Sequence, residues 1–160
     1  MTKEVMLEML KETDLEKDFK LVIDRDLTTF LKEVSPLLLK KPAIHSMILS
    51  MALKYLESNK STARLVRLCT KNGGLTVAGL QTEPHRCLII SECDPKSAIQ
   101  FAQRLFQEGI SIPGALGPLP GVREFCEEWS RLYQCKLKVA THLRLFEAPS
   151  IHYENEVEGN

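Results

Sequence analysis

A carboxylate and an imidazole stand two residues apart at Glu83 and His85, a pairing of side chains that can move protons. Either one can act as a general base when it comes within hydrogen-bond reach of a substrate amine. Pro84 lies between them, and a proline beside polar residues is also typical of an exposed turn without a catalytic role. Two interpretations therefore stay open for this segment, with Glu83 as the candidate catalytic base.

Histidine and cysteine at His85, Cys87 and Cys93 raise the question of a metal site. A structural zinc site needs four ligands, typically in pairs of cysteines separated by two to four residues. One residue separates His85 from Cys87, whereas Cys87 and Cys93 bracket an apolar run, and the neighbouring sequence offers no obvious fourth ligand. The spacing therefore predicts no bound metal.

The five cysteines form an odd set without the Cys-x-x-Cys spacing of redox and zinc motifs. Unpaired cysteines in a chain of this size are typical of reduced thiols in the cytosol, where disulfides are rare. We therefore predict a cytoplasmic protein. Cys126 and Cys135 belong to a helix and its end, where packing is the default role of a thiol.

Composition excludes several function classes. The chain has 160 residues, of which 44% are hydrophobic and 26% charged, as in one ordinary globular domain rather than a disordered chain. Its 21 Lys and Arg residues balance 21 Asp and Glu residues. A protein that binds nucleic acid through phosphates needs an excess of positive charge, so nucleic acid is not an expected partner.

No membrane or export segment is expected either. The longest apolar stretch, residues 47–53, includes Ser50 and is far shorter than the roughly 20 residues of a spanning helix. Near the amino terminus, Lys3, Glu4 and Glu8 interrupt the apolar residues that an export signal would need to be continuous.

The first 25 residues predict an acidic helix followed by a lead-in strand. Val5, Met6, Met9 and Leu10 recur at helical spacing and indicate a short amphipathic helix. That helix either packs against its own domain or docks on a partner. The strand is expected over residues 19–23.

Two helices should follow the strand. Asp26 can cap a helix that begins at Leu27, because its carboxylate can accept hydrogen bonds from the free amides of the first turn. Pro36 is expected to break or restart this helix, and Pro42 suits the first position of the next one. We place His45 on the surface. The expected buried side of the second helix consists of Ile44, Ile48, Met51, Ala52 and Tyr55.

The middle of the chain predicts strands. Asn72-Gly73 between two β-rich runs indicates a hairpin, since both residue types tolerate positive φ. The apolar run 87–91 predicts a strand inside the sheet. Asp94-Pro95 should then open a helix that Gly109 ends.

The last third of the chain is expected to contain three further elements. The Gly- and Pro-rich run 110–121 suggests a short buried strand and a shaped turn. A helix should cover 122–133, and the alternation of apolar residues over 137–147 predicts a final strand or hairpin. Residues 149–160 form a polar, acidic tail.

Five sequence patches, in this order of elements, resemble the GNAT superfamily of acyl-CoA-dependent N-acetyltransferases. More specifically, the chain resembles the amino-terminal half of bacterial two-part GNAT-like proteins, in which a typical GNAT domain follows. The match covers about residues 26–148. It implies an α/β fold of three layers, with a central mixed, mostly antiparallel sheet flanked by helices. The patches are 30–39, 41–45, 114–120, 125–129 and 132–147.

The resemblance also implies where acetyl-CoA would bind. GNAT domains carry a glycine-rich loop before the central helix, whose amides contact the CoA pyrophosphate. This chain has Glu92-Cys93-Asp94-Pro95 there, which adds negative charge, lacks glycine and removes one amide donor. The remaining candidate cofactor contacts are Lys96, Ser97 and Ala98.

Tyr133 occupies the place where many GNAT domains have a tyrosine that protonates the leaving thiolate. A phenol with a pKa near 10 suits a thiolate whose conjugate acid has a pKa near 8.5. The other interpretation of Tyr133 is a half-buried helical aromatic that only packs.

Two functions are therefore expected from different classes. In the first, the domain transfers an acyl group from acyl-CoA to an amine, with Tyr133 as acid and Glu83 as candidate base. In the second, it is a catalytically silent GNAT-like accessory module that binds a partner, a following catalytic GNAT domain or a second copy of itself. The degenerate loop favours the second for this chain alone, and the resemblance keeps the first open.

Overall fold

The computed structural model describes residues 2–11, 18–59 and 62–146 of the chain. The expected tail at 149–160 lies outside the described residues. The elements, in chain order, are α1 (Lys3–Lys11), β1 (Phe19–Asp24), α2 (Leu27–Leu38), α3 (Ser46–Ser58), β2 (Arg64–Thr70), β3 (Leu75–Gln81), β4 (Leu88–Ile90), α4 (Pro95–Gln107), β5 (Ala115–Leu116) and α5 (Gly121–Tyr133).

The described strands form one five-stranded sheet in the order β1-β2-β3-β4-β5. The first three pairings are antiparallel, and β4 and β5 pair in parallel, with Leu88 opposite Ala115. α4 connects these two parallel strands, as such a crossover requires. The sheet is mixed and mostly antiparallel, as expected.

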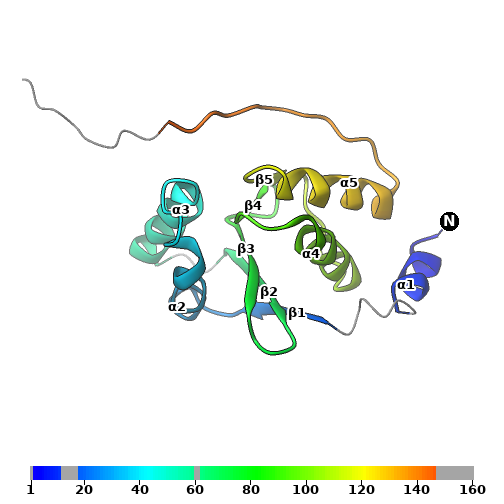
Figure 1. Ribbon diagram of the computed structural model, residues 1–160, viewed down its shortest axis with the longest axis horizontal. Helices are drawn as coiled ribbons and strands as arrows, with labels where there is room; N and C mark the ends of the chain where they lie inside the picture. Colours follow the sequence, from blue (N-terminus) through cyan, green and yellow to red (C-terminus); the bar gives the residue numbers. More distant parts are fainter. Residues whose placement is uncertain (1, 12–17, 60–61, 147–160) are drawn as a thin grey trace, which may run out of the picture.

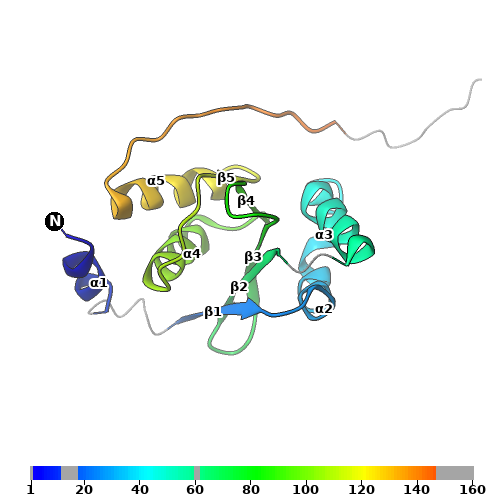
Figure 2. The ribbon, with the colours of Figure 1, turned by 180° about the vertical axis from the view of Figure 1, so that it is seen from behind.

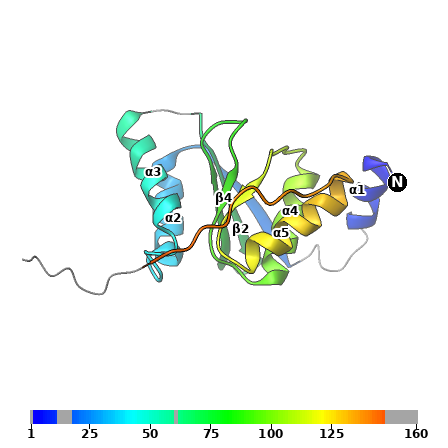
Figure 3. The ribbon, with the colours of Figure 1, turned by 90° about the horizontal axis from the view of Figure 1, so that it is seen from above.

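Helices cover both faces of the sheet. Figures 1 and 3 show α2 and α3 on one side and α4 and α5 on the other, and Figure 2 shows the same layers from behind. Alternate residues of a strand point to opposite faces, so Leu65 packs with the α2 and α3 core while its neighbour Val66 packs with α4 and α5. The three-layer α/β class predicted from the sequence is confirmed.

Short-range sequence patterns correctly predicted several of these elements. Asp26 caps α2 by accepting the Thr29 amide at 2.7 Å. The hairpin between β2 and β3 turns at Gly73, whose φ of 84° suits glycine. β4 lies between β3 and β5, with Leu88 fully buried. At the other end of the molecule, Met6 and Leu10 of α1 pack against Phe106 and Leu132.

Pro36 does not break α2, contrary to the sequence prediction. It lies inside the helix, two residues before its end. A proline there removes one backbone hydrogen bond near the terminus, where the helix is about to stop. Burial of Phe30, Val34 and Leu38 on the same helix offsets that loss, because the apolar face continues past the proline.

The start of α3 also differs from the prediction. The helix begins at Ser46, and Pro42 opens a separate single turn in which the His45 amide bonds to the Lys41 carbonyl at 3.1 Å. His45 has ψ of 12°, outside the helical range, which separates the turn from the helix. The structure buries Ile48, Ala52 and Tyr55 as expected, but Ile44 is exposed because it belongs to this turn.

The expected last strand is absent from the described part of the chain. Residues 135–146 form neither helix nor strand there, and Glu147 lies outside the described residues. They leave the end of α5 as an extended segment that turns back past α5 toward the side of α2 and α3 (Figures 1 and 3). β5 has two residues of intermediate burial, not a fully buried strand, so this edge offers few backbone groups to a further strand.

Within the described ranges, no helix combines the length and apolar character needed to cross a membrane.

Candidate functional site

The junction between β4 and α4 is where the resemblance implies a CoA site. Asp94 caps the amino terminus of α4. Its Oδ1 accepts a hydrogen bond from the Ser97 amide at 2.9 Å, and its Oδ2 accepts one from the Ser97 hydroxyl at 2.7 Å. The Ala98 amide donates to the Asp94 carbonyl at 3.0 Å. Pro95 has no amide to offer. The Ser97 and Ala98 amides therefore already have acceptors within the protein.

The electrostatics of Asp94 agree with this capping role. Partial burial by itself would raise the pKa of the carboxyl, but the hydrogen bonds from the Ser97 hydroxyl and amide outweigh it and hold the pKa below the ordinary value. The ionised carboxylate thus occupies the position at which a helix start would attract a phosphate.

Lys96 faces β1 rather than the loop. Its Nζ lies 5.7 Å from the centre of the Phe19 ring, a distance typical of a cation–π contact. Lys96 is the basic residue that we predicted from the sequence as a cofactor contact, since the glycine loop is missing. Its contact with Phe19 places its charge away from Asp94, whose carboxylate forms no ion pair among the described residues.

His45, in the turn before α3, contacts the same loop between β4 and α4. Its imidazole is buried, with 3% exposure, which corrects its predicted surface position. Nε2 accepts the Glu92 amide at 3.0 Å, so Nδ1 carries the proton and donates to the Leu38 carbonyl, also at 3.0 Å. Lys41 adds an ion pair with Glu92 at 2.7 Å. The turn before α3 thereby fixes the backbone of the loop.

A shallow cavity of about 470 Å³ adjoins the loop. Leu37, Leu75, Thr76 and Pro120 contribute the rest of a lining that includes Glu92, Cys93 and Asp94. The Cys93 thiol is a poor nucleophile, because burial and then the neighbouring Asp94 and Glu92 charges raise its pKa to about 12. Lys41 compensates the Glu92 charge, but the Asp94 carboxylate makes this cavity unfavourable for a polyanionic cofactor.

Two glycines allow the chain after β5 to contact the end of β4 and the residues that follow it. A Cβ on Gly117 would lie 2.8 Å from the Ile90 carbonyl oxygen, and one on Gly121 would lie 2.9 Å from the Cys93 carbonyl oxygen. The chain that follows β5 therefore packs directly on the chain that follows β4. The sequence predicts a short buried strand and a shaped turn over 110–121, and the strand is found at Ala115–Leu116 with intermediate burial. Nothing in the sequence pattern indicates the two glycine contacts.

Tyr133 lies away from the loop, in an aromatic cluster at the end of α5. Its hydroxyl donates to the Ile110 carbonyl at 3.0 Å, and its ring packs edge-on against Phe106 and tilted against Trp129. Burial raises the pKa of the phenol above its usual value. The geometry is that of a packed aromatic with a satisfied hydroxyl.

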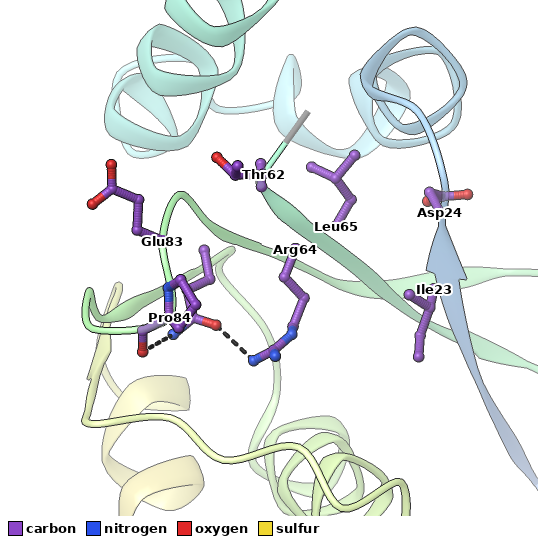
Figure 4. Close-up of a pocket in the computed structure, with 9 residues that line it drawn as sticks. Ile23, Asp24, Thr62, Arg64, Leu65, Glu83 and Pro84 are labelled. Atoms are coloured by element: carbon purple, nitrogen blue, oxygen red, sulfur yellow. Dashed lines mark hydrogen bonds between the residues drawn. The ribbon is translucent and has the colours of Figure 1, made fainter. Parts of the chain in front are cut away.

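Glu83 lies on a different cavity, at the end of β3 (Figure 4). The Nε2 of His85 is 3.2 Å from the Glu83 carboxylate, and both side chains are substantially exposed. Tyr133 lines neither this cavity nor the one beside Cys93. The structure thus does not bring the predicted base and the predicted acid into one cavity.

No three histidine, cysteine or acidic residues of the described ranges stand close enough together to hold a metal ion. Neither protein-family models nor curated proteins nor solved structures gave a match to this chain.

Proposed function

We propose that this chain is a GNAT-like accessory module that transfers no acyl group itself and acts by binding a partner protein. The order of β1, α2, α3, β2, β3, β4, α4, β5 and α5 supports the GNAT-like part of the proposal, since it is the order that the resemblance implies. The parallel pairing of β4 and β5 across α4 agrees with it.

One observation carries the catalytically silent part of the proposal. An acyl-CoA in a GNAT site lies in a splay between the two parallel strands, with its pyrophosphate on the amides of the next helix. Here Gly117 packs on Ile90 and Gly121 on Cys93, while Asp94 occupies the start of α4. Strand ends in backbone contact leave no splay, and a capping carboxylate repels a phosphate.

The segment after α5 supports a role in protein binding. Leu137, Val139, Leu143 and Leu145 alternate along an extended chain, and each is at least 49% exposed. Exposed apolar residues at a spacing of two indicate a strand face that a partner can cover. The cationic residues Lys136, Lys138 and Arg144 alternate with them, which favours a partner with acidic residues on the other face.

Calorimetric titration with acetyl-CoA tests the absence of a cofactor site. We expect a dissociation constant in the millimolar range or weaker, near −4 kcal/mol, because the helix dipole alone contributes only about 0.3–1 kcal/mol. A GNAT domain with an intact glycine loop, titrated in the same buffer, is the positive control. Saturable micromolar binding would overturn the proposal.

Photo-crosslinking tests the partner-binding role. A photoreactive amino acid replaces Leu143 in one variant and the exposed Lys54 of α3 in a matched control, and both proteins are irradiated in cells. We expect a protein that carries a catalytic GNAT domain to be linked through position 143 alone, and Val139→Glu to abolish the link. Equal labelling from both positions would contradict the assignment of this segment.

Acyl transfer to an amine is the second candidate, favoured by the same β4-α4-β5 connection. It would require acetyl-CoA as substrate, a deprotonated amine and an amide on the central strand that polarises the acyl carbonyl. Micromolar binding in the titration above would move the proposal to this candidate, with Lys96 and the Ser97 and Ala98 amides as the contacts to alter first.

A further inference from the structure

A cavity of about 270 Å³ lies at the opposite end of the strands from the β4–α4 loop. The end of β1, the start of β2 and the end of β3 meet there, since Asp24 pairs with Leu65 and Arg64 with Gln81. Figure 4 shows Arg64 and Ile23 extending to the same side of the sheet. This place is distinct from the site that the proposed function concerns.

Arg64 is the cationic residue of this cavity and has only neutral partners. Its Nη1 donates to Gln81 Oε1 at 2.7 Å and to the Ser111 carbonyl at 3.4 Å. Among the described residues, no carboxylate forms an ion pair with it. Asp24 lines the cavity too, but Arg67 already holds its two oxygens at 2.6 and 2.8 Å.

Arg67 also indicates what Arg64 is able to bind. Arg67 grips the Asp24 carboxylate with Nε and Nη2, the two adjacent donors of a guanidinium fork. In Arg64 these same two atoms donate to no partner within the described part of the chain. The fork that one arginine uses for an internal carboxylate is thus available on the other.

The Gln81 side chain holds the Arg64 guanidinium in place. Gln81 is 1% exposed, and its Nε2 donates to the Pro84 carbonyl at 3.2 Å and the Arg86 carbonyl at 2.7 Å. These bonds leave Oε1 facing Arg64, so one nitrogen of the guanidinium is anchored before any ligand arrives. Anchoring of this kind lowers the entropy lost on binding.

The other lining residues and the volume limit the size and charge of a ligand that this cavity can bind. Ile23 is half-exposed beside Arg64 and can cover a short apolar group. The volume lies just below the roughly 300–1,000 Å³ of pockets for drug-sized ligands, which indicates a smaller molecule. Glu83 on the rim disfavours a second negative charge. We propose that this cavity binds a small monocarboxylate, with its carboxylate on Arg64 Nε and Nη2 and its apolar body against Ile23.

Nuclear magnetic resonance titration of the full chain with sodium hexanoate tests this proposal. We expect saturable shifts of the amide signals of 62–65 and 81–84, with acetate binding more weakly because it lacks the apolar body. Inorganic phosphate and hexylamine are the two comparison ligands. Equal binding of phosphate would indicate a general anion site, and binding of hexylamine an apolar site; either result would overturn the proposal.

Variants assign the carboxylate contact to Arg64. Arg64→Gln should weaken hexanoate binding at least about tenfold, and Arg64→Lys should weaken it too, because an ammonium keeps the charge but lacks the fork. Arg25→Gln, which changes a neighbouring arginine outside the lining, is the matched control. Ile23→Ser should remove the preference for hexanoate over acetate. Absence of saturable binding, or unchanged affinity in both Arg64 variants, would overturn the proposal.

Discussion

The backbone amide of Glu92 donates a hydrogen bond to Nε2 of His45 across 3.0 Å, joining the loop after β4 to the turn before α3. The two residues are 47 positions apart in the chain. Because the imidazole is buried, both of its nitrogens need partners, and Leu38 supplies the second. This single side chain therefore couples the α2–α3 layer to the start of α4.

Replacing His45 should lower the free energy of unfolding, because it removes the hydrogen bonds that couple the two layers. His45→Phe keeps a ring of similar shape but leaves the Glu92 amide without an acceptor, which should cost about 1–3 kcal/mol in the free energy of unfolding. The Leu38 carbonyl loses one hydrogen bond and keeps the one from the Lys41 amide at 3.3 Å. His45→Gln can still accept and donate, so it should lose less. Urea denaturation measures both, and equal midpoints for the two variants would contradict the role.

The close backbone contacts at Gly117 and Gly121 predict that neither position tolerates a side chain. Gly117→Ala places a methyl group against the Ile90 carbonyl, and Gly121→Ala places one against that of Cys93, so each should destabilise the fold by about 1–3 kcal/mol. Gly114→Ala is the matched control, because its methyl would meet only the Cys87 side chain at 3.2 Å. Thermal unfolding that ranks Gly114→Ala with the other two would argue against backbone closure.

Asp94 predicts a pH-dependent part of the stability. Its pKa is lowered in the folded state, so its contribution is present above the unfolded pKa of about 3.9 and is lost as the pH falls through the folded pKa. Asp94→Ala should cost about 1 kcal/mol at neutral pH and little under strongly acidic conditions. Chemical denaturation between neutral and acidic pH measures the difference, with Asp18→Asn as a control outside any helix cap. A constant difference at every pH would contradict the cap.

The thiols should react in an order set by burial. Cys87 and Cys135 are exposed and should react first with a disulfide reagent near pH 8. With a pKa of about 12, Cys93 has a thiolate fraction on the order of 10⁻⁴ at that pH, and it should react far more slowly than the two exposed thiols. Cys93→Ser should leave the fast phase unchanged. Loss of fast amplitude in that variant would place the Cys93 thiol in solvent.

Tyr133→Phe separates the two candidate functions. If the chain transfers acyl groups with Tyr133 as acid, turnover should fall at least about tenfold. In the proposed silent module, the change removes only the bond to Ile110 and should cost about 1 kcal/mol of stability. The raised phenol pKa predicts that the stability due to Tyr133 is present at neutral pH and is lost as the pH rises through the folded pKa. An active wild type slowed by this substitution would favour the transferase.

Local chemistry explains which features were predictable from the sequence. The caps at Asp26 and Asp94, the hairpin turn at Gly73 and the buried strand at 88–90 depend on residues within a few positions of one another. A short-range hydrogen bond, a positive φ or an apolar run is encoded at the place where it acts, so pattern and structure agree there. The expected α/β class came from the resemblance that the order of these elements carries.

Contacts between distant segments decided the rest. The burial of His45 depends on the Glu92 amide, and the closure at Gly117 depends on the Ile90 carbonyl. The alternation at 137–145 is a strand pattern, yet the segment pairs with no strand within the described structure. A strand needs the backbone groups of a neighbour, and a buried imidazole needs two partners, so only the tertiary arrangement determines which of these residues obtain them.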